Sequence, residues 1–226
     1  MTRLSTLATE IAACRACPRL VAWREEVARE KRAAYRDERY WGAPIAGFGD
    51  VSARIVVVGL APGAHGANRT GRIFTGDRSG DFLFAALHRA GLASQPASTG
   101  RRDGLRLRDV FVTMPVRCAP PGNRPSPDEL ARCAPWLDRE LALLRNATVF
   151  LALGAVAWDA VLAHAARVHG ALASPRPRFA HGASQRLGAR TLLGSYHVSQ
   201  QNTQTGRLTA AMFDAILARA GVLAGG

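Results

Sequence analysis

The residues from Gly59 to Asp77 combine five glycines with a proline, two arginines, a histidine and an aspartate. They follow the apolar run 54–58, which predicts a buried strand. Glycines let backbone amides approach a ligand closely, and open α/β sheets place their binding sites where parallel strands end. A long, glycine-rich loop at this position therefore predicts a binding or catalytic site rather than a plain connection.

Four cysteines form a second group of residues with chemical potential: Cys14, Cys17, Cys118 and Cys133. The first two make a C-x-x-C pattern before Pro18, and the last two flank a proline-rich loop. In a cytosolic protein such a set indicates a metal site rather than disulfides. Four thiolates suit either structural zinc or an iron–sulfur cluster. Four unrelated buried cysteines are the alternative, because the second pair lacks close spacing.

A second polar stretch, His197–Arg207, follows the apolar run 191–195, which predicts another strand. Two further runs, 109–117 and 147–153, complete a set of four predicted strands, and a helical segment follows each of them. This alternation predicts an α/β fold, with a mainly parallel four-stranded sheet inside a three-layer α/β/α sandwich. The polar loops after the first and fourth strands should then meet at one rim of the sheet.

The remaining segments complete the predicted organisation. The helix after the glycine-rich loop has Asp77 or Ser79 as its N-cap. Residues 1–45 predict two helices and a loop before the first strand, and residues 171–178 predict a proline-containing loop. We predict one domain over 1–226, with the helical segment of about 1–45 attached to it.

The composition favours a polyanionic partner. The formal net charge is +13, which favours nucleic acid over a basic surface without a partner. Lys31 is the only lysine, so part of the arginine content reflects the bias of a GC-rich genome. We find no secretory signal and no apolar run of membrane-spanning length, and we expect a cytoplasmic protein without a membrane partner.

Four short motifs lie in order along nearly the whole chain. They are C-x-x-C-P at Cys14–Pro18, G-L-A-P-G at Gly59–Gly63, N-R-T-G-R-x-F-T-G-D at Asn68–Asp77 and S-Y-H-V-S-x-Q-N-T-x-T-G-R at Ser195–Arg207. Each motif is modest alone, but together they are highly specific, and the chain resembles family 5 uracil-DNA glycosylase, also called UDGb. The resemblance implies an α/β/α fold, a 4Fe–4S cluster, and removal of uracil and other deaminated bases, such as hypoxanthine or xanthine, from DNA.

The resemblance implies catalytic roles for Asp77 and His197. Hydrolysis of a glycosidic bond needs the base out of the stack, a water on one face of the sugar and help for the departing base anion. Asp77 resembles the acidic residue that positions or activates this water and stabilises the cation-like sugar. His197 resembles the histidine that donates a hydrogen bond to the leaving base, a contribution of roughly 3–4 kcal/mol in the transition state. From the residues alone, Asp77 is also a good helix N-cap and His197 a strand-end cap.

The same resemblance implies a pocket for the flipped base. Phe74 resembles the aromatic residue that stacks on the base, although a core phenylalanine is the simpler interpretation of the residue alone. Gly63 and Ala64 would offer their backbone amides to the base.

Two positions depart from the pattern of the neighbouring family 4. That family has a catalytic acid where this chain has Leu60, so the acid here would be Asp77. It also has an asparagine that reads the edge of uracil where this chain has Met114, and a pocket without such a reader should discriminate less between bases. Asn123 in the proline-rich loop is a candidate substitute, and a turn residue after Gly122 is the alternative.

Polar and basic residues near the motifs are candidates for contacts with DNA. Gln201 and Asn202 would fill the gap left by the flipped base through hydrogen bonds. Arg69, Arg72 and Arg207 are candidates for phosphate contacts, with a solvated surface position as the alternative for each of them.

For the cysteines, the resemblance favours a 4Fe–4S cluster over zinc, with a structural role that ties residues 1–45 to the proline-rich loop. The only lysine, Lys31, lies in the predicted second helix, so no Schiff base is expected and the glycosylase should be monofunctional. We predict a monomer acting on damaged DNA. The alternatives are a non-catalytic iron–sulfur protein that binds nucleic acid and a nucleotide-binding enzyme, although the glycine-rich loop matches neither common nucleotide-binding pattern.

Overall fold

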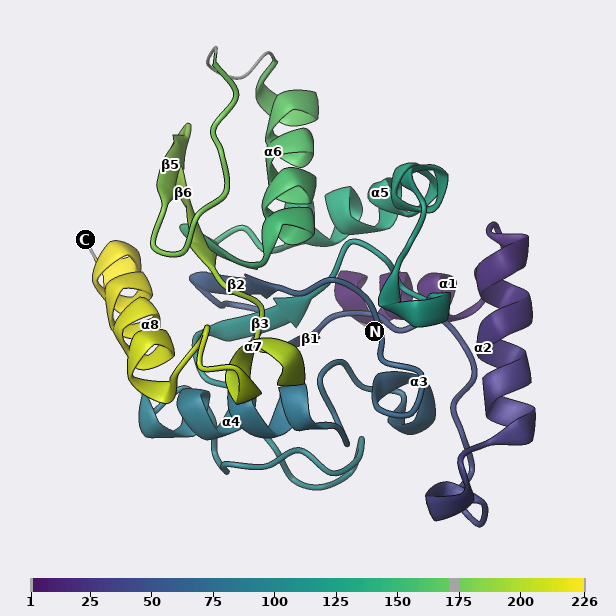
Figure 1. Ribbon diagram of the computed structural model, residues 1–226. Coiled ribbons are helices and arrows are strands. Elements are labelled where there is room, and N and C mark those ends of the chain that lie inside the picture. The colour runs from purple at the N-terminus through teal and green to yellow at the C-terminus, as the bar shows by residue number, and fades with distance from the viewer. Residues whose placement is uncertain (1, 171–174, 226) are drawn as a thin grey trace.

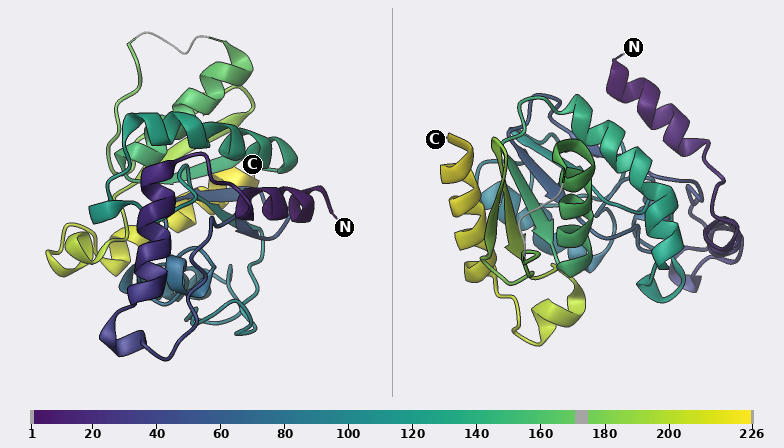
Figure 2. Two further views of the ribbon diagram at one scale, coloured as in Figure 1. Left: turned by 90° about the vertical axis from the view of Figure 1, so that its right-hand side faces the viewer. Right: turned by 90° about the horizontal axis from the view of Figure 1, so that it is seen from above.

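The computed structural model describes residues 2–170 and 175–225 (Figure 1). The loop expected over 171–178 therefore lies partly outside the described residues. The centre of the molecule is a six-stranded sheet in the order β1-β3-β2-β4-β6-β5. The described termini lie on different sides of the molecule (Figure 2).

Four parallel strands form the middle of the sheet and confirm the four predicted from the sequence. They are β2 (Ile55–Val58), β3 (Val110–Thr113), β4 (Val149–Leu153) and β6 (Arg190–Ser195). Their apolar runs are buried because helices cover both faces.

The sheet is wider than the four strands expected, because an antiparallel strand lies at each edge. These strands are β1 (Phe48–Gly49), which pairs with β3, and β5 (Ser184–Leu187), which pairs with β6. β1 has two residues, and three of the four residues of β5 are polar, as suits an exposed edge. Neither strand has an apolar run that would reveal it in the sequence.

Helices on the two faces complete the predicted three-layer sandwich (Figure 1). α5 (Pro127–Leu143) and α6 (Ala155–His169) cover one face, and α4 (Arg78–Arg89) and α8 (Ala210–Gly225) cover the other. Alternate residues of each strand enter the two cores: in β2, Val57 packs toward α4 and α8, and Val56 toward α5 and α6.

The N-terminal segment packs outside these layers. α1 (Arg3–Ala12) contacts α5, and α2 (Pro18–Glu30), followed by a 3-10 turn (Ala33–Tyr35), contacts the short helix α3 (Ala67–Thr70). α2 lies on the opposite side of the molecule from α8 (Figure 1). Among the helices described, none is long and apolar enough to cross a membrane.

Two short elements lie in the loops at the strand ends. A 3-10 turn (Pro121–Asn123) belongs to the proline-rich loop after β3, and α7 (Gln200–Gln204) belongs to the polar loop after β6. α5 begins at a capping box in which Ser126 and Glu129 each accept a hydrogen bond from the backbone amide of the other. This cap fixes where the proline-rich loop ends.

Candidate active site

The polar loops after β2 and β6 meet at one rim of the sheet, as the sequence predicts. The ring centroids of Phe74, from the first loop, and His197, from the second, are 6.0 Å apart. A Cβ atom on Gly154, which follows β4, would lie 3.5 Å from Cβ of His197. The residues that carry the two polar motifs are therefore one site, although about 120 positions separate them in the sequence.

Asp77 is the N-cap of α4 and also a carboxylate of this site. Its Oδ1 atom accepts a hydrogen bond of 2.9 Å from the amide of Gly80. Its Oδ2 atom faces the glycine turn, where Cβ atoms on Gly63 and Gly66 would lie 3.1 and 2.0 Å from it. Burial raises the pKa of Asp77, and the amides of Ser79 and Gly80 offset part of this effect. One oxygen is thus held by the helix, while the other lies in the turn.

Phe74 is held in an unusual backbone conformation. Its φ is 51°, in the left-handed region that bulky side chains rarely adopt, at a cost on the order of 1–3 kcal/mol. The ring lies over Gly59, where an added Cβ would come within 2.8 Å of Cζ, and the carbonyl oxygen lies 1.8 Å from the position of a Cβ on Gly80. The side chain is 8% exposed and packs against the core. Phe74 is therefore both part of the core and the aromatic wall of the site.

The glycine turn offers backbone donors beside this wall. Within the described residues, the amides of Gly63 and Ala64 donate no hydrogen bond to the protein, whereas the carbonyl of Gly63 accepts one of 3.0 Å from the amide of Asn68. The turn is thus fixed on its carbonyl side, and its amides can serve a ligand. The predicted contact of these amides with a base remains a prediction.

His197 is a neutral imidazole at physiological pH. Burial lowers its pKa to about 4. Its carbonyl oxygen accepts a hydrogen bond of 2.8 Å from Nδ2 of Asn202. A neutral imidazole has one N–H to donate, and the side chain of Asn202 fixes the loop that presents it.

Two of the predicted phosphate contacts need correction. Arg69 and Arg72 are each 8% exposed, and their guanidinium groups bind other parts of the protein. Arg69 pairs with Glu38 and donates to the carbonyl of Gly76 at 2.9 Å. Arg72 pairs with Asp103 inside the protein. Both arginines position the glycine-rich loop, because their donors are already used within the fold.

The other predicted base-binding and DNA-binding residues lie on the surface. Gln201 and Arg207 are exposed in the loop that follows His197, and the Arg207 guanidinium lies 4.6 Å from the ring centroid of Tyr196. Asn123 is exposed in a turn with φ of 56°, and its amide donates to the carbonyl of Pro120 at 3.1 Å. Their contacts with DNA remain predictions.

The four cysteines are free thiols, and two buried arginines lie beside them. Nη1 of Arg24 donates to Sγ of Cys118 at 2.9 Å, and the amide of Arg117 donates to Sγ of Cys133 at 3.4 Å. Burial raises the pKa of Cys118, and the nearby thiols of Cys14 and Cys17 raise it further. The cysteines expected to share a site are therefore neighbours.

In the described structure, these thiols lie near one another without the geometry of a metal site. Over residues 2–170 and 175–225, no group of three or more His, Cys, Asp or Glu side chains is arranged to hold a metal ion. Burial raises the pKa of Cys133 to about 12, with smaller contributions from Cys118 and Cys17. The Nε atoms of Arg24 and Arg117 are buried and have no hydrogen-bond partner among the described residues. Arg117 is already paired with Glu140 inside the protein, whereas the buried Arg24 donates to Sγ of Cys118. Arg24 is therefore the cation that suits an anionic group at the thiols.

Sequence reasoning misses several residues that position the site. Gly66 sits against Asp77, but nothing in its spacing distinguishes it from the other glycines of the loop. Asn68 is 1% exposed and donates from Nδ2 to the carbonyl of Arg24 at 3.2 Å, which joins α2 to the glycine-rich loop. Such contacts depend on the tertiary fold, so the sequence carries no signal for them.

Comparison with known proteins places the chain in a family. The family model of the uracil DNA glycosylase superfamily matches residues 46–221. Type-5 uracil-DNA glycosylase of Thermus thermophilus is 57% identical over 95% of this chain and 95% of its own length. The type-5 enzyme of Mycobacterium tuberculosis is 55% identical over 95% of this chain and 80% of its own, and that of Pyrobaculum aerophilum 45% identical over 94% and 89%. The chain belongs to the uracil-DNA glycosylase superfamily and to its type-5 branch.

Proposed function

We propose that this protein is a monofunctional DNA glycosylase that hydrolyses the N-glycosidic bond of uracil in DNA. The observation that carries the proposal is the meeting of Phe74 with His197, 6.0 Å apart, beside the glycine turn that holds the carboxylate of Asp77. An aromatic wall, a neutral donor and a carboxylate are the groups that base release requires. The membership in the type-5 branch supports the same reaction class.

Each group has one task in the proposed mechanism. The flipped base stacks on Phe74 and accepts hydrogen bonds from the amides of Gly63 and Ala64. As the C1′–N1 bond breaks, its electron pair leaves with the base, and the neutral imidazole of His197 donates a hydrogen bond to the oxygen on which negative charge develops. A neutral donor suits this task, because burial keeps the pKa of His197 near 4.

The carboxylate of Asp77 acts on the other side of the sugar. Ionised, it stabilises the cation-like sugar and orients a water whose oxygen forms the new bond to C1′. The proton released from this water ends on the departing base, so charge and atoms balance. The hydrogen bond from Gly80 holds one carboxylate oxygen in place, which leaves the other for the water.

We also propose that the pocket accepts other deaminated bases, including hypoxanthine and xanthine. Met114 is 1% exposed and packs in the core, so it offers no hydrogen bond to the edge of a base. Backbone amides recognise a carbonyl oxygen, which uracil, hypoxanthine and xanthine all carry. Discrimination that depends on a side-chain reader is then weak.

The test is base release from labelled duplexes that carry one uracil, one hypoxanthine or one xanthine. We expect release of uracil and of at least one purine base. Release of uracil alone would contradict the broad pocket while leaving the uracil activity standing. No release of any base by folded protein that binds DNA would support the alternative, a non-catalytic nucleic-acid-binding protein.

The four cysteines are proposed to hold a 4Fe–4S cluster. Cys14 and Cys17 precede α2, Cys118 lies in the proline-rich loop, and Cys133 lies in α5. A cluster with its four thiolates is anionic, which suits the buried Arg24, whose Nη1 atom donates to Sγ of Cys118 and whose Nε atom has no hydrogen-bond partner among the described residues. When bound, the cluster would serve as a structural tie between residues 1–45 and the proline-rich loop.

This part of the proposal has its own readout. Protein purified without oxygen should show the broad visible absorbance of a 4Fe–4S cluster and contain four irons per chain. Cys133→Ser should lose iron and lower the unfolding temperature, while Ser126→Ala, in the same region, should keep its iron. Stoichiometric zinc without iron would contradict the cluster.

We further propose that the enzyme acts as a monomer in the cytoplasm. Its exposed large apolar side chains do not form one patch on a single element of the described structure: Trp41 and Val51 lie in loops, Val156 and Val168 near opposite ends of α6, and Val222 in α8. The free thiols suit a reducing compartment. Sedimentation at micromolar concentration would report the assembly state, and a dimer would contradict the monomer.

A further inference from the structure

Residues 92–108 form an arm that leaves the end of α4 and returns to the start of β3. A bridge between Ala93 and Leu107 joins its two sides, and Leu107 packs against the core. The arm therefore has a defined base, and its tip, residues 98–103, lies at the other end. No predicted role from the sequence involves this segment.

The tip of the arm is attached to the glycine-rich loop of the active site. The guanidinium of Arg72 pairs with Asp103, and both side chains are less than a tenth exposed. Arg72 also donates to Oγ of Ser98 at 2.6 Å, and the amide of Gly76 donates to the carbonyl of Ser98 at 3.1 Å. The tip thus sits beside the residues that carry Phe74 and Asp77.

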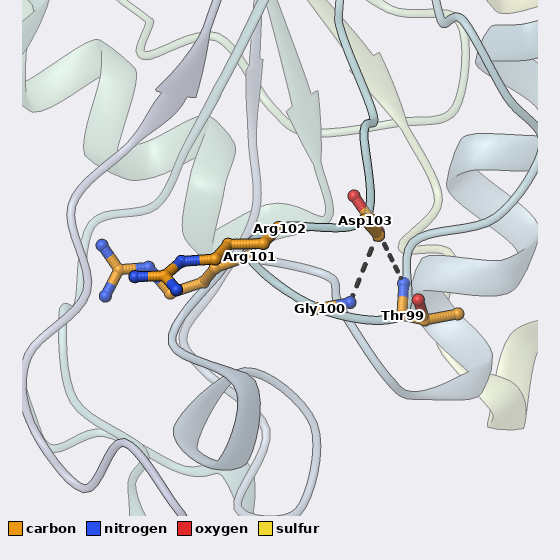
Figure 3. A pocket seen from close by; sticks show the side chains of 5 residues that line it. All are labelled: Thr99, Gly100, Arg101, Arg102 and Asp103. Atoms are coloured by element: carbon orange, nitrogen blue, oxygen red, sulfur yellow. Dashed lines mark hydrogen bonds between the residues drawn. The ribbon is translucent and has the colours of Figure 1, made fainter.

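Two arginines at the tip have no ion-pair partner among the described residues. Arg101 and Arg102 are exposed, and neither forms an ion pair or a side-chain hydrogen bond within the described part of the chain. They line a hollow of about 760 Å³ together with the rest of the segment Thr99–Asp103. Figure 3 shows both guanidinium groups pointing to the same side, away from the carboxylate of Asp103.

One of these arginines is already oriented. The Arg101 guanidinium lies 4.4 Å from the ring centroid of Trp41, which is 37% exposed. The indole is itself fixed, because its Nε1 atom donates to the carbonyl of Pro44 at 3.1 Å. A guanidinium stacked on an aromatic face keeps the N–H groups at its edge free for a planar anion.

We propose that Arg101 and Arg102 form a binding site for the backbone phosphates of DNA beside the flipped nucleotide. The site rests on the proposed function, which supplies the DNA. Its charge is uncompensated, because the one carboxylate of the arm, Asp103, is neutralised by Arg72. Arg72 therefore contributes to binding by holding the arm rather than by contacting phosphate.

Because the tip is attached to the glycine-rich loop, the proposed phosphate site also positions the bound DNA. DNA held by Arg101 and Arg102 is placed at a fixed distance from the loop that presents Phe74, because the buried contacts of Arg72 join the two. A phosphate site at this position determines which nucleotide faces the pocket. Loss of the two arginines should therefore weaken DNA binding while leaving the chemical step intact once DNA is bound.

The test measures binding of an undamaged, uracil-free duplex by fluorescence anisotropy at a series of sodium chloride concentrations. The plot of log Kd against log salt should lose about one unit of slope for each arginine replaced by alanine, so about two for the double variant. Arg101→Lys keeps the charge but not the fork or the stack, and it should weaken binding severalfold with a nearly unchanged slope.

Arg145→Ala is the matched control, because Arg145 is exposed before β4, at the opposite rim of the sheet. For Arg145→Ala, the slope of log Kd against log salt should match that of the unmodified protein. A double variant with an unchanged slope, or an equal change in Arg145→Ala, would overturn the site. Thermal unfolding checks that every variant is folded. Since the duplex carries no uracil, this result is independent of base release, and failure of the enzyme to release uracil would contradict only the proposed function.

Discussion

The carboxylate of Asp77 and the backbone of Gly66 are in such close contact that a Cβ on Gly66 would lie 2.0 Å from Oδ2. The φ of Gly66 is −96°, outside the left-handed region, and the nearby carboxylate leaves no room for a side chain there. The same carboxylate caps α4 through its other oxygen. A helix end and a glycine turn thus fix the two oxygens of the proposed catalytic acid independently.

Gly66→Ala should abolish most of the activity. The added methyl group must displace the carboxylate of Asp77, and misplacing a reacting group by about 1 Å can lower the rate of the chemical step on the order of 100-fold. Single-turnover release of uracil measures this rate. Gly221→Ala, in open space on α8, is the control and should keep full activity.

Asp77→Asn should raise the stability of the folded protein and abolish its activity. The folded pKa of Asp77 is raised above 3.8 by burial, so the ionised carboxylate costs the folded state stability at neutral pH. Asparagine caps a helix as well as aspartate does and carries no charge. The unfolding temperature of the variant should exceed that of the unmodified protein at pH 7, and the advantage should vanish below pH 3.8. A lower unfolding temperature at pH 7 would contradict this interpretation of the burial.

The stability of the protein should fall as the pH drops from 6.5 to 4, in part because of His197. Its folded pKa of about 4 lies below the ordinary value of 6.5, so the unfolded chain takes up a proton in this range and the folded protein does not. The full shift corresponds to about 3 kcal/mol. His197→Gln should remove this share of the pH dependence of chemical unfolding, whereas His88→Gln, at an exposed position, should retain it. Equal pH dependence in both variants would contradict the neutral imidazole.

Arg72→Ala should destabilise the fold far more than Arg54→Ala. The pair of Arg72 with Asp103 is buried, so the substitution leaves an uncompensated carboxylate and should cost about 3–5 kcal/mol. Arg54 pairs with Asp109 on the surface, where such a pair contributes at most about 1 kcal/mol. Urea unfolding of the two variants at pH 7 gives the comparison.

The pH dependence of this pair follows from Asp103. Burial would raise the pKa of Asp103, but hydrogen bonds from Arg72 and three backbone amides lower it to about 2. The stability contributed by the ionised carboxylate is therefore present above pH 3.8 and is lost as the pH falls toward 2. A similar loss of stability in Arg72→Ala and Arg54→Ala would show that the arm is not held by this pair.

The sequence predicts the central sheet well because the signal is local. Each of the four parallel strands is a short apolar run followed by a helical segment, and the start of α5 is marked by a recognisable cap at Ser126. The meeting of Phe74 with His197 is also predictable, because the ends of parallel strands share one rim. The edge strand β5 lacks such a signal, since it is polar and exposed.

The sequence does not predict correctly which arginines are free to contact phosphate. The motif that contains Arg69 and Arg72 favours phosphate contacts, yet both side chains are buried and bind Glu38 and Asp103. Those partners lie about 30 positions away in segments with no motif, so only the tertiary structure reveals the pairing. The exposed Arg101 is as basic in the sequence as Arg72, and only burial distinguishes them.

The most direct measurement is single-turnover release of uracil from a duplex by the unmodified protein and by Asp77→Asn, each in excess over DNA and each shown to bind it. We predict rapid release by the unmodified protein and a loss on the order of 1,000-fold or more in the variant, with DNA affinity retained. Equal rates in the two proteins would contradict the role of Asp77, and no release by either would contradict the proposed enzyme.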